Sequence, residues 1–198
     1  MMTYETLLAL TGFAFVTSAT PGPNNLMLMA SGANFGMRRT VPHMLGISVG
    51  FSVMCVMVGL GVAGVIFAWP MADLVLRGLS VAYMLWLAWK IARAGGPGEG
   101  RAGTRPMSFA AAAAFQWVNP KAWAMALGAI ALYAPDQSLA ALALVAAVFG
   151  LVNLPTVSLW AAAGQGLRRV LTSPARLRAF NWTMAGLLVA SLLPVVWR

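Results

Sequence analysis

Long stretches of apolar residues, separated by short polar connectors, form the dominant pattern of this sequence. No charged residue occurs from Thr40 to Met71 or from Met107 to Pro120. An α-helix needs about 20 apolar residues to cross a hydrocarbon core of roughly 30 Å. The pattern therefore predicts an all-α membrane protein with six transmembrane helices, over residues 5–29, 42–68, 71–93, 108–133, 138–164 and 178–197.

The first predicted helix contains a break at residues 20–25 (TPGPNN). Each proline lacks a backbone N–H and clashes with the preceding turn, and the glycine between them adds conformational freedom. Lipid offers no hydrogen-bond partner for the carbonyls released around Ser18 to Thr20, so this backbone must face protein or water. The two asparagines add side-chain amides, and an asparagine here can cap the half-helix that follows.

The fourth predicted helix contains a second break, at residues 116–121 (QWVNPK). A proline biases the residue before it away from helical geometry. In secondary transporters a pair of interrupted helices, one in each half of the chain, points to the substrate site. The alternative is a pair of ordinary proline kinks that neighbouring helices satisfy. The paired breaks favour a substrate-binding site that includes Pro21, Gly22, Pro23, Asn24, Asn25, Asn119, Pro120 and Lys121.

Lys121 is a charged residue predicted to lie near the middle of the membrane, where an ionised group is costly unless it is paired or faces water. The predicted spans contain no acid except Glu5 and Asp73, which lie at their outer ends. One interpretation is that the long side chain snorkels towards an interface. The functional interpretation is that its ammonium faces a wet cavity, is held by the freed carbonyls and meets a substrate carboxylate.

Two further polar residues lie in apolar helices. Asn153 precedes Pro155, which is expected to kink the fifth helix, and Asn153 is a candidate for the cavity lining. His43 follows Pro42 at the start of the second helix and is the candidate for proton coupling, because histidine titrates near neutral pH. An interfacial histidine that forms hydrogen bonds is the alternative.

The chain divides into two three-helix halves within a single transmembrane domain, residues 1–198. Residues 1–94 form the first half, residues 95–107 a connector rich in Gly, Pro and Arg, and residues 108–198 the second half. An odd number of helices per half predicts inverted-topology repeats, with helices one and four broken at proline. Most of the 13 basic residues flank the first, third and fifth connectors, so the positive-inside rule places those connectors in the cytoplasm and both termini outside.

The composition excludes several functions. The sequence is 61% hydrophobic and 9% charged, whereas charged residues make up roughly a quarter of soluble domains. The net charge of +9 does not indicate nucleic-acid binding, because the basic residues lie in connectors and the eight tryptophans suit interfacial belts. One histidine, one cysteine and no buried acid predict neither a catalytic pair nor a metal site, so we expect no enzyme and no cofactor.

The breaks and their neighbours resemble the LysE/RhtB family of bacterial amino-acid exporters. The similar segments are residues 20–25 (TPGPNN), 30–32 (ASG), 35–39 (FGMRR), 42–43 (PH), 46–47 (GI), 83–87 (YMLWL) with Lys90, and 119–122 (NPKA). The resemblance covers essentially the whole chain. It implies a six-helix inner-membrane protein that exports amino acids or close derivatives, driven by the proton gradient, with its site around the two breaks.

The predicted mechanism is alternating access around a site at the membrane midplane, with an amino acid and the lipid bilayer as partners. A cationic substrate side chain would find no carboxylate inside the membrane, so neutral amino acids are favoured. The same absence leaves proton coupling without its usual carboxylate carrier. The alternatives are an exporter of an inorganic ion or other small solute, and a membrane assembly subunit that transports nothing; homo-oligomerisation is left open.

Overall fold

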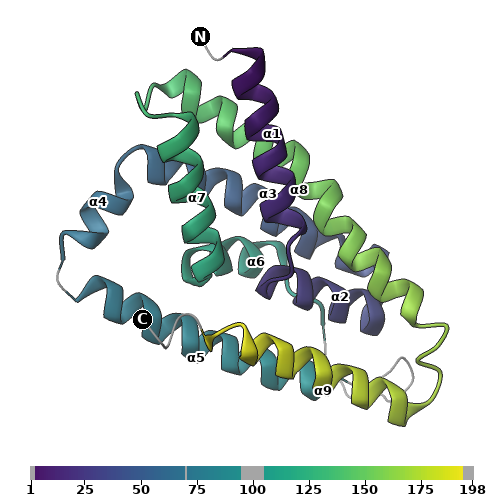
Figure 1. Cartoon of the computed structure of the whole chain (residues 1–198). Helices are drawn as coiled ribbons and strands as arrows, with labels where there is room; N and C mark the ends of the chain where they lie inside the picture. The colour runs from purple at the N-terminus through teal and green to yellow at the C-terminus, as the bar shows by residue number, and fades with distance from the viewer. Residues whose placement is uncertain (1–2, 70, 95–104, 194–198) are drawn as a thin grey trace.

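The structure, a computed structural model, describes residues 3–69, 71–94 and 105–193 of the chain. These residues form a bundle of α-helices with one short 3-10 helix, η1 (Figure 1). Three of the helices, α3, α5 and α8, are long and apolar enough to cross a membrane by themselves. The elements in chain order are α1 (Tyr4–Ala19), α2 (Pro23–Phe35), α3 (Met37–Gly59), α4 (Val62–Phe67), α5 (Ala72–Ala92), α6 (Phe109–Phe115), η1 (Gln116–Val118), α7 (Pro120–Tyr133), α8 (Leu139–Leu167) and α9 (Pro174–Ala190).

Both predicted helix breaks are confirmed. The first predicted helix is divided into α1 and α2, and the chain changes direction between them (Figure 1). The fourth predicted helix is divided into α6 and α7, with η1 between them, and α7 leaves at a steep angle to α6 (Figure 1). The fifth is the continuous helix α8, which includes Pro155.

The second predicted helix differs at both ends from its expected range, 42–68. It begins at Met37 instead of 42, because Gly36 (φ 81°) ends α2 and the next residue immediately starts a new helix. Pro42 lies in the second turn, where its missing N–H removes one helical hydrogen bond. The helix ends at Gly59, because Gly61 (φ 94°) has a left-handed conformation that favours glycine. The short helix α4 then follows.

The last predicted helix begins earlier than expected, at Pro174 instead of 178. The Ser173 hydroxyl caps this end by accepting a hydrogen bond from the Arg176 N–H at 3.2 Å, and proline at the first helical position needs no partner. Residues 194–197 of the predicted range, and residues 95–104 of the predicted connector, lie outside the described residues.

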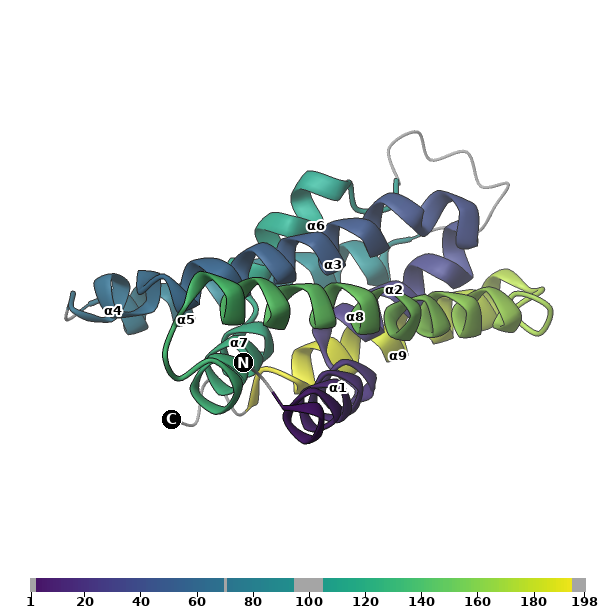
Figure 2. The same ribbon diagram turned by 90° about the horizontal axis from the view of Figure 1, so that it is seen from above.

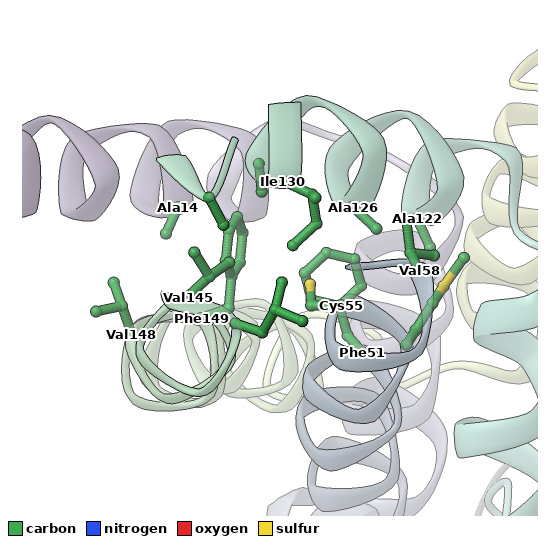
Figure 3. Close-up of a cluster of buried hydrophobic side chains, with 14 of the residues drawn as sticks. Ala14, Phe51, Cys55, Val58, Ala122, Ala126, Ile130, Val145, Val148 and Phe149 are labelled. Carbon is green, nitrogen blue, oxygen red and sulfur yellow. The ribbon is translucent and has the colours of Figure 1, made fainter. Parts of the chain in front are cut away.

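The largest apolar core lies where α1 and α7 pack on the crossing of α3 and α8 (Figure 3). Phe51 of α3 and Phe149 of α8 meet edge to face, with ring centroids 5.0 Å apart. Two serines of α3 donate to α8 carbonyls: Ser48 to Gly150 at 3.0 Å and Ser52 to Ala146 at 2.9 Å. Of the two half-helices in this core, α1 is thus supported by α8, and α7 is supported by α3 and α8.

A second group of contacts joins α2 to α8 and α9, and α9 to α5. The helices α5 and α9 lie side by side (Figures 1 and 2), and α2 packs against α8 and α9. A Cβ at Gly32 of α2 would lie 2.0 Å from the Ala161 carbonyl oxygen of α8, and one at Gly164 would lie 2.0 Å from the Met29 carbonyl oxygen. These glycines let the α2 and α8 backbones touch, which is how membrane helices approach most closely.

Candidate binding site at the two helix breaks

The first break separates the carbonyl end of α1 from the amino end of α2. Gly22 is extended, and Pro23 takes the first position of α2, where a missing N–H costs no helical hydrogen bond. The Asn25 amide donates to the carbonyls of Ser18 (2.8 Å) and Thr20 (2.9 Å). This amide closes the end of α1, so the expectation that an asparagine caps the following half-helix is wrong: Gly22 is the N-cap of α2, without a side-chain bond.

The second break is built by a different local arrangement. Asn119 is extended (φ −91°, ψ 109°), as the following proline requires. Its side-chain oxygen accepts a hydrogen bond from the Lys121 backbone N–H at 3.1 Å and caps α7, with Pro120 at the first helical position. The Trp123 indole donates to the Trp117 carbonyl at 2.8 Å, which satisfies a carbonyl of η1.

The two breaks meet through side chains that come from opposite halves of the sequence. The Asn24 amide donates to the Gln116 side-chain oxygen at 2.9 Å, and the Gln116 amide donates to Asn24 at 3.3 Å and to the Ala112 carbonyl at 2.9 Å. The Lys121 ammonium donates to the Thr20 carbonyl at the end of α1. One of the carbonyls expected to be freed by the prolines therefore holds the lysine.

A third wall comes from α8. The buried Asn153 amide donates to the Ser18 hydroxyl at 3.1 Å, while the Asn153 side-chain oxygen has no partner among the described residues. The first break, the second break and α8 surround a cavity of about 20 Å³. This cavity has room for about one water molecule. Its lining is formed by Thr17, Ser18, Gly22, Asn24, Asn25, Phe51, Gln116, Asn119, Lys121, Ala122, Met125, Asn153 and Val157.

The cavity combines positive and negative partial charges without a carboxylate in its lining. The amino ends of α2 and α7 begin here and carry the positive ends of their helix dipoles, and the Lys121 ammonium adds a full charge. The carbonyl end of α1 supplies the negative side. Within the part of the chain that the structure describes, the one ion pair found joins Asp73 and Arg77, so Lys121 is balanced by carbonyl dipoles alone.

Comparison with known proteins decides the family. The family model described as LysE type translocator matches residues 15–192, which include both breaks and the cavity between them. The chain belongs to the LysE type translocator family.

The similar curated proteins span almost the same length as this translocator. A cysteine/O-acetylserine efflux protein of Klebsiella pneumoniae subsp. pneumoniae is 30% identical over 201 residues, covering 98% of this chain and 99% of the relative. Proteins of the same name from Escherichia coli (strain K12) and Shigella sonnei are 31% identical over 194 residues, covering 95% of this chain and 96% of each relative. No solved structure matches the chain.

Membership makes this chain a multi-pass membrane transporter of an amino-acid efflux family, which is not a family of enzymes. The resemblance seen in the sequence is thereby confirmed. The predicted amide and lysine residues of the two breaks lie together around one cavity in this translocator, with Asn153 of α8 beside them. The prolines set the turns: Pro23 and Pro120 begin α2 and α7, and Pro21 is exposed.

Pro21, Pro23 and Pro120 do not line this cavity, and neither does His43, the candidate for proton coupling. His43 lies in α3 in the wall of a second, larger cavity. Its side chain is 2% exposed, and neither ring nitrogen has a hydrogen-bond partner among the residues that the structure describes. The hydrogen bond that the alternative interpretation expected is therefore not found among the described residues, because α3 starts before His43 and carries the ring inside the bundle. The depth of His43 in the membrane stays a prediction.

Among the lining residues that were not predicted as members of the site, Gln116 and Ser18 are the two that join its walls by side-chain hydrogen bonds. Gln116 forms the link between the breaks, and Ser18 joins α1 to Asn153. Gln116 carries a usable signal, since a glutamine in an alanine-rich apolar segment is costly in a membrane unless it is hydrogen-bonded. Ser18 carries no such signal, because serine also occurs widely as a small packing residue in membrane helices.

Proposed function

We propose that this translocator exports neutral amino acids or close derivatives across the bacterial inner membrane, by alternating access around the cavity between the two breaks. The observation that carries the proposal is the bond between the Lys121 ammonium and the Thr20 carbonyl. It places a mobile cation from one half of the chain on a helix-end carbonyl of the other half. A bound amino acid needs both of these groups, one for its carboxylate and one for its ammonium.

Substrate binding is then an exchange of partners. The substrate carboxylate attracts the Lys121 ammonium and the amino ends of α2 and α7. The Thr20 carbonyl, once released, accepts the substrate ammonium together with the Ser18 carbonyl, in place of Lys121 and the Asn25 amide. Each charged group of the substrate replaces an interaction that the empty protein already makes, so no buried charge is left without a partner.

The links that hold the two breaks together are weak enough to be replaced. Side-chain hydrogen bonds between membrane helices average about 0.6 kcal/mol. The Asn24–Gln116 pair and the Asn153–Ser18 bond are of this kind. A substrate that offers new partners to these amides can therefore separate the breaks at a small cost.

The size of the cavity supports an alternating mechanism. About 20 Å³ is too small for an amino acid, so the site must widen before it binds. We propose that the two halves are inverted repeats that move against each other. In support, the broken helix of each half packs on the helix that follows the broken helix in the other half. The helices α1 and α2 contact α8, while α6 and α7 contact α3.

The charge pattern supports the proposed direction of transport, and the names of the relatives support the proposed substrate class. The basic connectors favour a cytoplasmic position, with both termini outside, and the family resemblance supports export driven by the proton gradient. The relatives are named for efflux of cysteine and O-acetylserine, which are small and neutral overall. The absence of an acid from the lining of the cavity fits such substrates better than cationic ones.

Counterflow in proteoliposomes with a mixed pool of amino acids tests the proposal. We expect uptake of a neutral amino acid, and its loss in Lys121→Met, Asn24→Ala and Asn119→Ala. Lys121 is the proposed partner of the carboxylate, Asn24 links the two breaks, and Asn119 caps the α7 end that carries Lys121. Arg169→Met is the matched control for the lost charge, since Arg169 is exposed at the end of α8. It should keep full counterflow.

Folding of each variant is checked by gel filtration of the purified protein. Normal counterflow in all three site variants would contradict the proposed site. Flux of an inorganic cation without any amino acid would support the ion exporter, and absence of flux with every solute would support an assembly subunit. A protonophore should abolish uphill efflux while leaving counterflow intact.

A further inference from the structure

A second cavity lies beside the breaks, between α2, α3, α5 and the start of α6. Its volume is about 360 Å³, within the range of about 300–1,000 Å³ typical of small-molecule pockets. Its wall is mostly apolar, with Met27, Tyr83 and Trp86 among the larger side chains. An amino acid or a derivative fits here, whereas the cavity at the breaks holds about one water.

The two cavities follow each other along the same helices. On α2, Asn24 and Asn25 line the small cavity, and Met27 begins the wall of the large one. On the other side, Gln116 of η1 lines the small cavity, and Ala111 of α6 lines the large one. A solute that left the large cavity along α2 would therefore reach the breaks within about one helical turn.

Two buried side chains lie on these helices where the residues that line one cavity give way to those that line the other. Met27 is 4% exposed and Phe115 is 1% exposed, and both belong to one apolar cluster between α2, α5 and α6. The Phe115 ring packs on Tyr83, with centroids 5.6 Å apart, and Tyr83 lines the large cavity. A solute that moves along α2 and α6 from one cavity to the other would therefore pass these side chains, which can change rotamer.

The polar groups of the large cavity indicate the chemistry of its ligand. The charged residues of its wall, Lys90 and Arg105, are both cationic and exposed, and the Lys90 ammonium lies 4.5 Å from the Trp86 ring centroid. The imidazole of His43 lies in the wall with both ring nitrogens unpartnered among the described residues. A buried polar group without a partner costs about 1–3 kcal/mol, so a ligand that bonds to it gains this back.

We propose that this cavity is a second binding site, where a small carboxylate with an apolar body loads before it passes Met27 and Phe115 to the breaks. The carboxylate meets Lys90 and Arg105, the apolar body lies against the aromatic wall, and His43 bonds to a polar group of the ligand. The loading role rests on the proposed function, because a ligand loads here only if the protein then transports it through the site at the breaks. Binding itself does not depend on Lys121.

Protection of an engineered cysteine tests the site. In a Cys55→Ala background, Ala111→Cys places a thiol in the cavity wall and Ala163→Cys places a control thiol on the exposed side of α8. The probe is N-acetylleucine, which has a carboxylate and an apolar body and lacks the ammonium that the site at the breaks requires. We expect it to slow maleimide labelling of Ala111→Cys and to leave Ala163→Cys unchanged. Met107→Cys, also in the wall, serves if Ala111→Cys does not fold.

Three further variants decide between the sites. His43→Leu should raise the N-acetylleucine concentration for half-protection roughly five- to tenfold, as expected for one lost hydrogen bond, and His43→Gln should recover most of the loss. Lys121→Met should leave protection unchanged. Absence of protection at both wall cysteines, loss of protection in Lys121→Met, or no effect of His43→Leu would each overturn the second site. Failure of counterflow with protection intact would instead overturn transport and leave the binding site standing.

Discussion

At the scale of single residues, the site is defined by how one lysine is held without an acid. The Lys121 side chain crosses Gly22 to reach the Thr20 carbonyl. A charge that is balanced by carbonyl dipoles is easier to attract away than one in an ion pair, because no opposite full charge is left behind. This arrangement suits a residue that must change partners in every transport cycle.

Gly22→Ala should therefore impair transport without unfolding the protein. A Cβ at this position would lie 2.7 Å from the Lys121 Cδ and 3.1 Å from its ammonium nitrogen, so the lysine arm must move off the Thr20 carbonyl. The backbone at Gly22 is extended, a conformation that alanine adopts, so the side chain and not the main chain is affected. Counterflow in proteoliposomes measures the loss.

Gly12→Ala is the matched control for this prediction. Gly12 lies in α1, and a Cβ there would meet no atom within 4 Å. It should keep full counterflow and an unchanged melting temperature. Equal counterflow in Gly22→Ala and Gly12→Ala would show that the position of the lysine arm does not matter.

At the scale of elements, both broken helices have a part that is held against a continuous helix by close backbone contact at glycine. The α2 helix is locked to α8 where Gly32 and Gly164 let the backbones touch, and α1 contacts the same helix. The α6 segment packs on α3 in a similar way, where a Cβ at Gly46 would lie 2.4 Å from the Phe109 carbonyl oxygen. These contacts tie a part of each broken helix to a continuous helix of the other half.

Gly32→Ala and Gly164→Ala should each destabilise the protein, because the new methyl group would overlap a backbone carbonyl that cannot rotate away. Overpacking of this kind costs about 1–3 kcal/mol. Thermal unfolding in detergent should show lower melting temperatures for both. Gly166→Ala lies in the same helix with no atom within 4 Å of its Cβ, and it should melt like the parent. Unchanged melting temperatures in both site variants would refute the close crossing.

At the scale of the whole molecule, the features predicted correctly are those set by local chemistry. Both breaks follow from prolines that lack an N–H and restrict their neighbours, and the sequence shows these directly. The placement of Asn24, Asn119 and Lys121 around one cavity agrees with this reasoning. The charge pattern and the lengths of the apolar segments identified a membrane protein, which family membership confirms.

The remaining features depend on tertiary contacts that no local pattern contains. Gln116 became part of the site because α2 brings Asn24 to it from the other half of the chain. His43 was expected near an interface, but the early start of α3 carries it into the bundle beside a cavity. Asn25 closes the helix before it and not the one after it, a choice set by where the freed carbonyls lie.

The orientation of the molecule provides the last prediction. If the halves are inverted, the connector between α8 and α9 lies in the cytoplasm and the connector between α7 and α8 lies outside. In a Cys55→Ala background, Thr172→Cys and Asp136→Cys place exposed thiols in these two connectors. A maleimide that cannot cross membranes should label Asp136→Cys in intact spheroplasts. It should label Thr172→Cys only in inverted vesicles, because basic connectors are retained on the cytoplasmic side. Labelling of both thiols from one side would rule out a membrane crossing by α8, and with it the inverted arrangement of the two halves.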